Sequence, residues 1–358
     1  MASIIATRPE LLVPLYKEVS PVLISRFGDR EETVRLEVWA TYVTLLTQTR
    51  LYGGGPQTRD SVGLKRKRTP DGSDLEETAY SLLQSQVPAL AKTLLNQLKS
   101  PRTPTATLQA GFGLLHTLLQ VLPGSLSSQT GLIVSISKTI LSQPPSTSSS
   151  TLHISCLQFT SSFFASHPPP AFVNSLPVLT PVLLKTLGEK HPRVASEAFR
   201  VFSSLLGALK PVRGQDWVES VYEEAIARLA NHATDADVRS SAEDVIGDLW
   251  LNAPDTVHTK SGQEWDYVCR TTGRTDGAVK VVIRVAREAD ISEEWISGCV
   301  EWATKLLTKS GRTGKAEVFE CLSVLLSRSV LSLDAAPIID HSPFSDTTTT
   351  CQPICYAL

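Results

Sequence analysis

The sequence has few aromatic residues and no long apolar run. Aromatic side chains make up 6% of the 358 residues, and hydrophobic residues make up 42%. This balance favours a core of Leu, Val and Ala, which is typical of helical proteins. No uninterrupted apolar stretch reaches the roughly 20 residues that span a bilayer, and residues 1–10 contain no basic segment followed by an apolar one. We therefore expect neither membrane insertion nor secretion.

The chain also lacks a net charge of either sign. It has 34 Lys and Arg residues against 36 Asp and Glu residues, which gives a formal charge of −2. A strong basic field captures nucleic acid or anionic membrane, and this chain has none. We expect a protein partner, with no nucleic acid, no membrane and no small-molecule substrate.

Cysteines are sparse and fall mostly inside apolar helical patterns, as reduced core thiols do. They are Cys156, Cys269, Cys299, Cys321, Cys351 and Cys355. Sparse, buried cysteines predict an intracellular protein. Together with the basic cluster described below, they lead us to expect a cytoplasmic and nuclear location.

Apolar stripes recur at a fixed period along the chain. Stripes with helical spacing begin at Leu108, Leu152, Val194 and Val238, which are 44, 42 and 44 residues apart. A similar stripe begins at Val34, and two more follow at 281–285 and from Val318. Steps of this size match the HEAT and armadillo repeats, whose period is about 40–47 residues.

A shorter apolar helix precedes most of these stripes, so the predicted unit is a helix pair. The first helices are expected at 87–98, 132–141, 176–187, 217–229 and 291–307. Prolines recur in or near them, at Pro14, Pro21, Pro88, Pro177 and Pro181. Asp29 with Glu32, and Asp216 with Glu219, have the spacing of capping boxes. The sequence predicts an all-α HEAT-repeat α-solenoid of about seven stacked antiparallel helix pairs.

Two segments depart from the repeat pattern. Residues 51–77 are rich in glycine, proline and charge, so we expect a disordered basic loop that can be removed without unfolding the array. Residues 329–358 contain no Lys or Arg after Arg328 and carry no helical stripe, so we expect an unpacked tail. The predicted organisation is one HEAT repeat at 9–50, the loop at 51–77, HEAT repeats at 78–328, and the tail at 329–358.

Motifs for catalysis and metal binding are weak. Residues 311–316 resemble a phosphate loop, but the glycine spacing is too short and no Ser or Thr follows the lysine. The seven histidines form no i, i+4 pair of the kind that a helical zinc site needs, and Cys351 with Cys355 has no companion ligands. There is also no G-x-S-x-G nucleophile elbow. We expect no catalysis, no metal and no cofactor.

One short basic cluster has a specific interpretation. Lys65, Arg66, Lys67 and Arg68 are consecutive and precede Thr69-Pro70. Four adjacent cations in an accessible loop resemble a nuclear-import signal. The alternative is a solvated loop that no receptor recognises. No aromatic residues alternate with these cations, which argues against nucleic-acid binding by the cluster.

Longer strings resemble one family of HEAT-repeat proteins. They are LYKEVSPVLISRFGDREETVRLEVWATYVTLLTQTR (15–50), LLQSQVPALAKTLLNQLKS (82–100), LLHTLLQVLPGSL (114–126) and VASEAFRVFSSLLGALKP (194–211). Over residues 9–327 the chain resembles the central region of the cullin-associated and neddylation-dissociated proteins, also described as TATA-binding-protein-interacting proteins. A fungal-type or otherwise divergent form is the expectation.

The resemblance implies a non-catalytic scaffold that wraps around the unneddylated cullin–RING core. It further implies that the scaffold blocks the modification and adaptor sites of SCF-type ubiquitin ligases and promotes exchange of substrate receptors. The chain lacks the family's early and late repeats, and the pattern stops after Arg328, so we expect a truncated gene product that binds cullin weakly or not at all. The alternative function is a karyopherin-like nuclear transport carrier.

Second helices line the concave surface in most HEAT arrays, so exposed polar residues on them are the candidate partner contacts. These are Arg35, Glu37, Glu197, Arg200, Arg239 and Asp244. For each residue alone, an ordinary solvated helix face is the more common explanation.

Overall fold

The computed structural model describes residues 2–53, 78–144, 149–231, 233–256, 275–289, 291–309 and 314–334. Every secondary-structure element in these ranges is helical. The α-helices before residue 200 start in the order α1 (Ala2–Thr7), α2 (Leu12–Pro14), α3 (Ser20–Ser25), α4 (Glu32–Tyr52), α5 (Ala79–Lys99), α6 (Thr105–Val121), α7 (Thr130–Leu141), α8 (Ser150–Ser166), α9 (Leu176–Leu187) and α10 (Pro192–Leu209). They are followed by α11 (Asp216–Ala230), α12 (Ala236–Asn252), α14 (Thr275–Glu288), α15 (Glu293–Lys309) and α16 (Gly314–Asp334).

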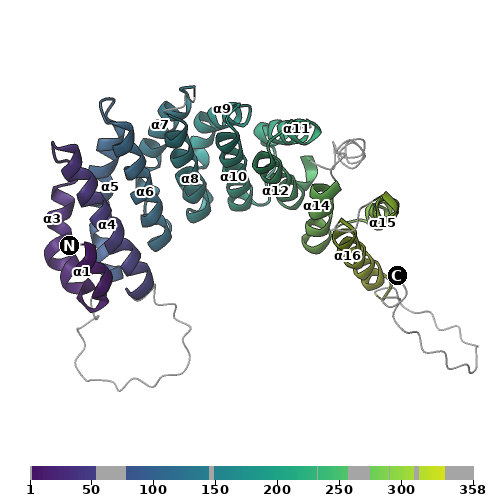
Figure 1. Ribbon diagram of the computed structural model, residues 1–358, viewed down its shortest axis with the longest axis horizontal. Helices are drawn as coiled ribbons and strands as arrows, with labels where there is room; N and C mark the ends of the chain where they lie inside the picture. Colours follow the sequence, from purple (N-terminus) through teal and green to yellow (C-terminus); the bar gives the residue numbers. More distant parts are fainter. Residues whose placement is uncertain are drawn as a thin grey trace, which may run out of the picture. The chain divides into compact units, whose positions relative to one another are not determined.

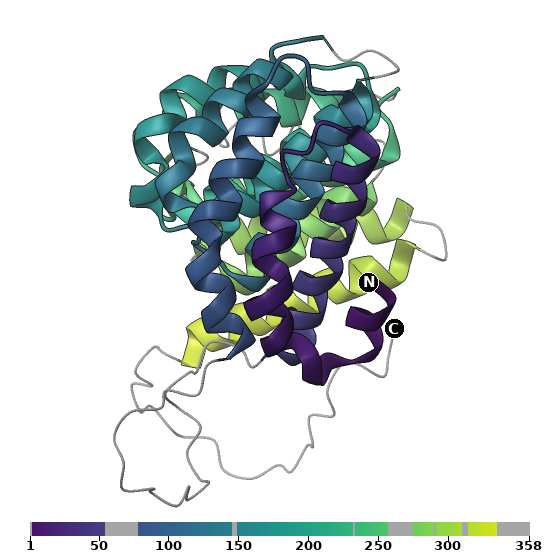
Figure 2. The same cartoon turned by 90° about the vertical axis from the view of Figure 1, so that its left-hand side faces the viewer.

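The chain divides into two compact units, Met1–Ala289 and Asp290–Leu358. In the first unit the helices form two rows (Figure 1). The first helices α5, α7, α9 and α11 pack against one another in sequence, and the second helices α4, α6, α8, α10, α12 and α14 form the other row. In the second unit α15 packs on α16. The helices nearest the N-terminus, in purple, can also be followed in Figure 2. The fold is the predicted all-α HEAT-repeat solenoid.

Apolar stripes explain why the second helices pack in a row. In α10 the stripe residues Val194, Ala198, Phe202 and Leu205 are all fully buried. Each stripe is too wide to be covered by one partner helix, so it is buried only when the neighbouring repeat packs beside it. The stripe on α4 is less complete, because Val34 and Val38 are half-buried.

A chain of aromatic rings joins α6 to α8. Phe159 lies between Phe112, at 5.6 Å, and Phe163, at 6.2 Å, measured between ring centroids. Phe163 in turn stacks on the His167 ring at 4.1 Å. His167 accepts a hydrogen bond at Nε2 from the backbone N–H of Leu126, 3.2 Å away. These contacts tie the turn before α7 to the end of α8.

The two capping boxes expected from the sequence were wrong. Glu31 is the N-cap of α4 and has no side-chain cap; Asp29 instead accepts from the Glu31 N–H within the preceding turn. Glu32 accepts from the Thr107 hydroxyl of the next repeat, at 2.7 Å. Asp216 lies inside the first turn of α11 rather than at its N-cap. A capping box does form between Thr78 and Ser81, at the start of α5.

Element boundaries differ from the predicted ones at three places. Helix α1 precedes the expected start at residue 9 and packs against α4. Helix α4 continues to Tyr52, and α16 continues to Asp334, beyond the predicted limit at residue 328. Most of the predicted loop, 54–77, lies outside the described residues, as do 335–358 and the segment 257–274 before α14. Pro88 and Pro181 are inside first helices, as expected.

Candidate protein-interaction surface

Polar side chains link each second helix to the next one. Ser162 Oγ lies 2.8 Å from Nδ1 of His116, so it joins α8 to α6. Ser161 and Ser204 share a hydrogen bond of 2.7 Å between α8 and α10, and Ser196 and Ser241 share one of 2.8 Å between α10 and α12. The bonded residues are 46, 43 and 45 positions apart, which is one repeat in each case. Equivalent positions of successive repeats therefore meet on this row.

Charge is unevenly distributed along the row. Helices α6 and α8 contain no Asp, Glu, Lys or Arg. Helices α10, α12 and α14 carry both signs. Within the second helices described in the first unit, ionic contacts to a partner are thus confined to α4 and to the stretch α10–α14.

Two of the six predicted contact residues hold turns together. Arg239 is only 7% exposed. Its Nη1 donates to the carbonyl oxygen of Leu229 at 3.3 Å, and its Nη2 donates to that of Asn231 at 3.2 Å. These carbonyls belong to the end of α11, where backbone acceptors lack helical partners. Arg239 is therefore engaged inside its own repeat.

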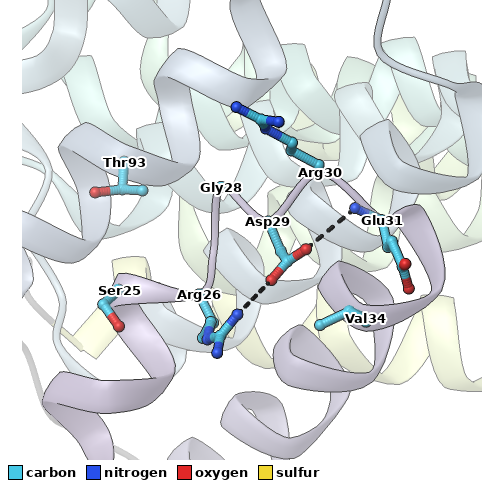
Figure 3. A pocket seen from close by; sticks show the side chains of 8 residues that line it. All are labelled: Ser25, Arg26, Gly28, Asp29, Arg30, Glu31, Val34 and Thr93. Carbon is cyan, nitrogen blue, oxygen red and sulfur yellow. Dashed lines mark hydrogen bonds and ion pairs between the residues drawn. The ribbon is translucent and has the colours of Figure 1, made fainter.

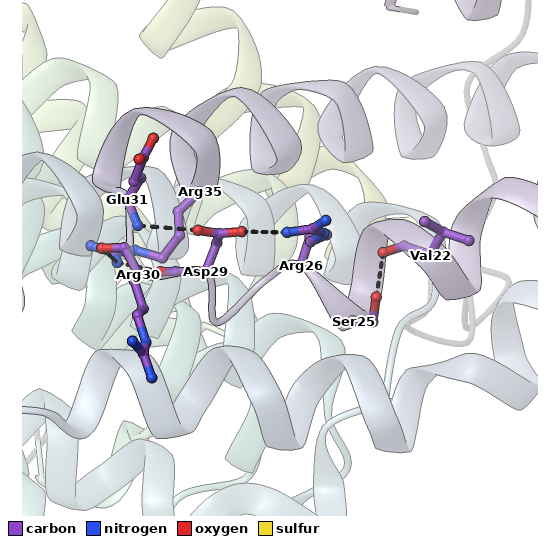
Figure 4. A network of polar contacts seen from close by, with 7 residues as sticks. All are labelled: Val22, Ser25, Arg26, Asp29, Arg30, Glu31 and Arg35. Carbon is purple, nitrogen blue, oxygen red and sulfur yellow. Dashed lines mark hydrogen bonds and ion pairs between the residues drawn. The ribbon is translucent and has the colours of Figure 1, made fainter.

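Arg35 makes the same kind of contact on α4, near the N-terminal end of the row. Its Nη1 donates to the carbonyl oxygens of Asp29, at 2.6 Å, and Arg30, at 3.2 Å. Figure 4 shows the guanidinium beside the turn that connects α3 to α4. Arg35 and Arg239 each follow the first valine of their stripe, so they occupy equivalent repeat positions. Each arginine thus donates to carbonyl oxygens of the turn that precedes its own helix.

Glu197 is also engaged internally. It is 8% exposed, and its Oε1 accepts from Nε2 of Gln158 at 3.1 Å and from Nη1 of Arg200 at 2.8 Å. The Arg200 side chain is 58% exposed, so much of its guanidinium surface faces solvent. Glu37 and Asp244 are exposed as predicted. Burial raises the pKa of the Asp244 carboxyl above its ordinary value of 3.8. Partner binding by the six residues stays a prediction.

A hollow of about 890 Å³ opens beside the turn between α3 and α4. Thr93 of α5 forms its far side (Figure 3). Arg26 donates to Asp29 at 3.0 Å, and the Asp29 carboxylate accepts from the backbone N–H of Glu31 at 3.1 Å. Both bonds lower the pKa of Asp29, and the bond from the Glu31 backbone has the larger effect. Two arginines and two acids line the hollow, so it presents balanced charge rather than an ion-binding site.

A second hollow, of about 640 Å³, lies on the first-helix row between α9 and α11. Pro177 and Pro181 of α9 face Trp217 of α11 across it. Trp217 donates through Nε1 to Oε1 of Gln215 at 3.2 Å. The sequence analysis identified the prolines but not this recess, because it forms only where two repeats meet.

Two buried thiols in the described part of the chain have raised pKa values. Burial raises the pKa of the Cys156 thiol to about 12, and burial raises that of Cys321 to about 12 as well. Such thiols are protonated at neutral pH and are poor nucleophiles.

No group of three or more His, Cys, Asp or Glu residues among the described positions is arranged to hold a metal ion. Within the same residues, no helix has the length and apolarity needed to cross a membrane. Lys65 to Arg68 lie outside the described residues.

Comparison with known proteins shows which proteins the chain resembles. The family model described as "CAND1-like, TPR repeats" matches residues 114–245. The chain is CAND1-like. A relative from Arabidopsis thaliana, "Cullin-associated NEDD8-dissociated protein 1", is 30% identical over 253 residues, which is 69% of this chain and 19% of the relative. A relative from Emericella nidulans, "Cullin-associated NEDD8-dissociated protein 1, C-terminal part", is 25% identical and covers 87% of this chain and 36% of that protein.

The CAND1-like chain spans about a fifth of the length of the Arabidopsis relative. Its repeat separations of 43 and 45 residues are longer than the roughly 34 residues of a TPR unit and fit HEAT repeats. Among solved structures, a Kap121p mutant aligns with a TM-score of 0.52 at 12% identity, covering 92% of this chain and 32% of that chain. This likeness concerns the fold alone.

Proposed function

We propose that this chain is a non-catalytic interaction scaffold that binds a cullin. The observation that carries the proposal is the relationship, at 30% identity, to proteins named for association with cullins. The second-helix row adds a suitable surface, because it presents exposed charges at Glu37, Arg200 and Asp244. Charged groups across an interface direct association and choice of partner more than they raise affinity.

The finer proposal is that the chain takes part in regulating SCF-type cullin–RING ligases. In this role it occupies the unneddylated cullin and promotes exchange of substrate receptors. A solenoid binds by laying successive repeats along its partner. Because the chain spans 19% of the Arabidopsis relative, we expect it to provide a share of that contact and to bind more weakly than the longer protein.

The second candidate is a karyopherin-like carrier. The likeness to Kap121p favours it only at the level of the fold. Carriers of this type are expected to recognise a Ran-type GTPase, whereas a cullin-associated scaffold is not. The two proposals therefore differ in their partner, and one binding assay separates them.

The experiment is a calorimetric titration of the purified chain into an unneddylated cullin–RING complex and, separately, into a GTP-loaded Ran-type GTPase. Saturable binding to the cullin complex alone, weaker than that of a longer relative measured beside it, supports the proposal. Binding to the GTPase alone supports the carrier. Absence of cullin binding at concentrations of about 100 µM overturns the cullin proposal for this chain, because weaker complexes fall outside the range of specific association.

We also propose a cytoplasmic and nuclear location, with Lys65 to Arg68 as the import signal. Four adjacent cations are the feature that import receptors recognise. A fluorescent fusion of the chain should enter the nucleus, and replacement of all four cations by alanine should retain it in the cytoplasm. Unchanged nuclear entry of the alanine variant would show that the cluster is a solvated loop.

A further inference from the structure

Three exposed charges of alternating sign lie on three successive second helices. They are Arg200 on α10, Asp244 on α12 and Lys280 on α14. Helix α12 packs between α10 and α14, so the three residues follow one another across the row. The sign alternates from positive to negative to positive.

Electrostatic coupling places the three side chains on one face. After burial, the charges that act on Asp244 are those of Arg284, Asp248, Arg200 and Lys280, in order of decreasing effect. Lys280 and Arg284 are four residues apart and share one side of α14. Arg284 reaches back to α12, where Nη1 donates to the Asp244 carbonyl oxygen at 3.1 Å and Nη2 pairs with the Asp248 carboxylate. The side of α14 that carries Lys280 therefore faces the same solvent as Asp244.

Neighbouring charges on this face are already engaged. The Glu197 carboxylate accepts hydrogen bonds from Gln158 and Arg200, and the Asp248 carboxylate accepts one from Arg284. In contrast, neither the Asp244 carboxylate nor the Lys280 ammonium makes a hydrogen bond or ion pair with any described residue. Partial burial of Asp244 raises its pKa, so this carboxylate is incompletely solvated while it lacks a partner.

We propose that Arg200, Asp244 and Lys280 form a docking row for a protein surface carrying an acid, a base and an acid in matching order. Packed helices lie about 8–10 Å apart, so the partner charges should have a similar spacing. The inference rests on the proposed function and specifies which part of the second-helix row meets the partner. The sequence analysis named Arg200 and Asp244 but missed Lys280, because Lys280 lies 36 residues after Asp244 and the repeat separations are 43–46 residues, so the period did not point to it.

A protein fits this row better than a nucleic acid or a lipid surface does. Phosphate backbones and anionic membranes present charge of one sign, and they are attracted by clusters of cations. The central Asp244 would repel such a surface at the middle of the row. An alternating row instead selects a partner by the order of its charges, since a wrong register brings like charges together.

The decisive variant exchanges two charges and keeps the total. Asp244→Lys combined with Lys280→Asp preserves the net charge and removes no intramolecular bond of the described residues. The matched control makes the same exchange on the first-helix row, as Lys185→Asp with Asp216→Lys, where both residues are exposed on neighbouring helices. Circular dichroism melting checks that each variant is folded. The probe is an unneddylated cullin–RING complex, titrated at about 50 and 200 mM salt.

The exchange on the second-helix row should weaken binding roughly tenfold or more, while the control exchange should leave it within about twofold. The parent should also lose more affinity with salt than the exchanged variant does. If the parent binds and the exchanged variant binds equally well, the docking row is wrong and the scaffold function stands. If the parent does not bind the cullin complex at all, the proposed function fails, and this inference fails with it.

Discussion

The Nη1 atom of Arg239 donates a hydrogen bond to the carbonyl oxygen of Leu229, ten residues earlier, across 3.3 Å. The second guanidinium nitrogen donates to Asn231. The side chain of an arginine on a second helix thus closes the turn that follows the first helix of the same pair. Arg200, one repeat earlier, is 58% exposed and, among the residues that the structure describes, forms its ion pair with Glu197.

This contrast predicts effects of different size for two alanine substitutions. Arg239→Ala should lower the free energy of unfolding by about 2–3 kcal/mol, because buried backbone acceptors lose a charged donor. Arg200→Ala should change it less, by about 1 kcal/mol, since the Arg200 side chain is 58% exposed and the buried Glu197 carboxylate keeps its hydrogen bond from Gln158. Urea denaturation followed by circular dichroism measures both. Equal effects of the two substitutions would contradict the structural role of Arg239.

Two glycines of α6 form a second matched pair. A Cβ atom added to Gly111 would lie 2.5 Å from Cδ2 of Leu98 and 3.3 Å from Cζ3 of Trp39, whereas one added to Gly113 meets nothing within 4 Å. Gly113→Ala should raise the stability by about 0.5–1 kcal/mol through helix propensity. Gly111→Ala should lower it by about 1–3 kcal/mol through overpacking. Thermal melting of the two variants should shift in opposite directions, and a shared rise would show that Leu98 adapts freely.

The aromatic chain between α6 and α8 predicts a large cavity effect. Phe159 is 1% exposed and lies between Phe112 and Phe163. Phe159→Ala should cost about 3–5 kcal/mol of unfolding free energy. Phe319 is 39% exposed and serves as the control, because Phe319→Ala leaves a smaller void. The prediction fails if chemical denaturation gives the two variants similar midpoints.

The half-buried His116 and the buried His167 predict a loss of stability in mild acid. Burial lowers the pKa of His116 and also that of His167 below the ordinary value of 6.5. As the pH falls through 6.5, the unfolded chain takes up protons that the folded chain does not, so unfolding becomes easier. The melting temperature should fall between pH 7.5 and pH 5.5.

The double variant His116→Gln with His167→Gln should show a shallower fall over the same range, and each single variant should lie between it and the parent. Gln at position 116 keeps a polar group beside Ser162, which His116 contacts at 2.8 Å. A double variant with the slope of the parent would assign the acid sensitivity to other groups.

Several features of the protein follow from the sequence alone. The stripes from Leu108, Leu152, Val194 and Val238 recur at a constant step, and a repeated apolar face can be buried only by stacking. The spacing of apolar residues along the chain is enough to reveal this requirement for stacking. The class of fold, the identity of the second helices and the resemblance to a family are therefore accessible without coordinates.

The tertiary structure decided which polar residues remain available to a partner. By helical spacing alone, one expects Arg35, Glu197 and Arg239 to be exposed. In the structure, however, Arg35 and Arg239 bond to turns, and Glu197 bonds to a residue of the preceding repeat. The bonds of Glu197 and of Ser161 join residues 39 and 43 positions apart. Such contacts depend on how two repeats pack, and helical periodicity does not specify the atoms that meet there. The availability of Asp244 and Lys280 was also decided by the tertiary structure. Whether a charged side chain is available to a partner depends on the bonds that it and its neighbours make in the folded chain.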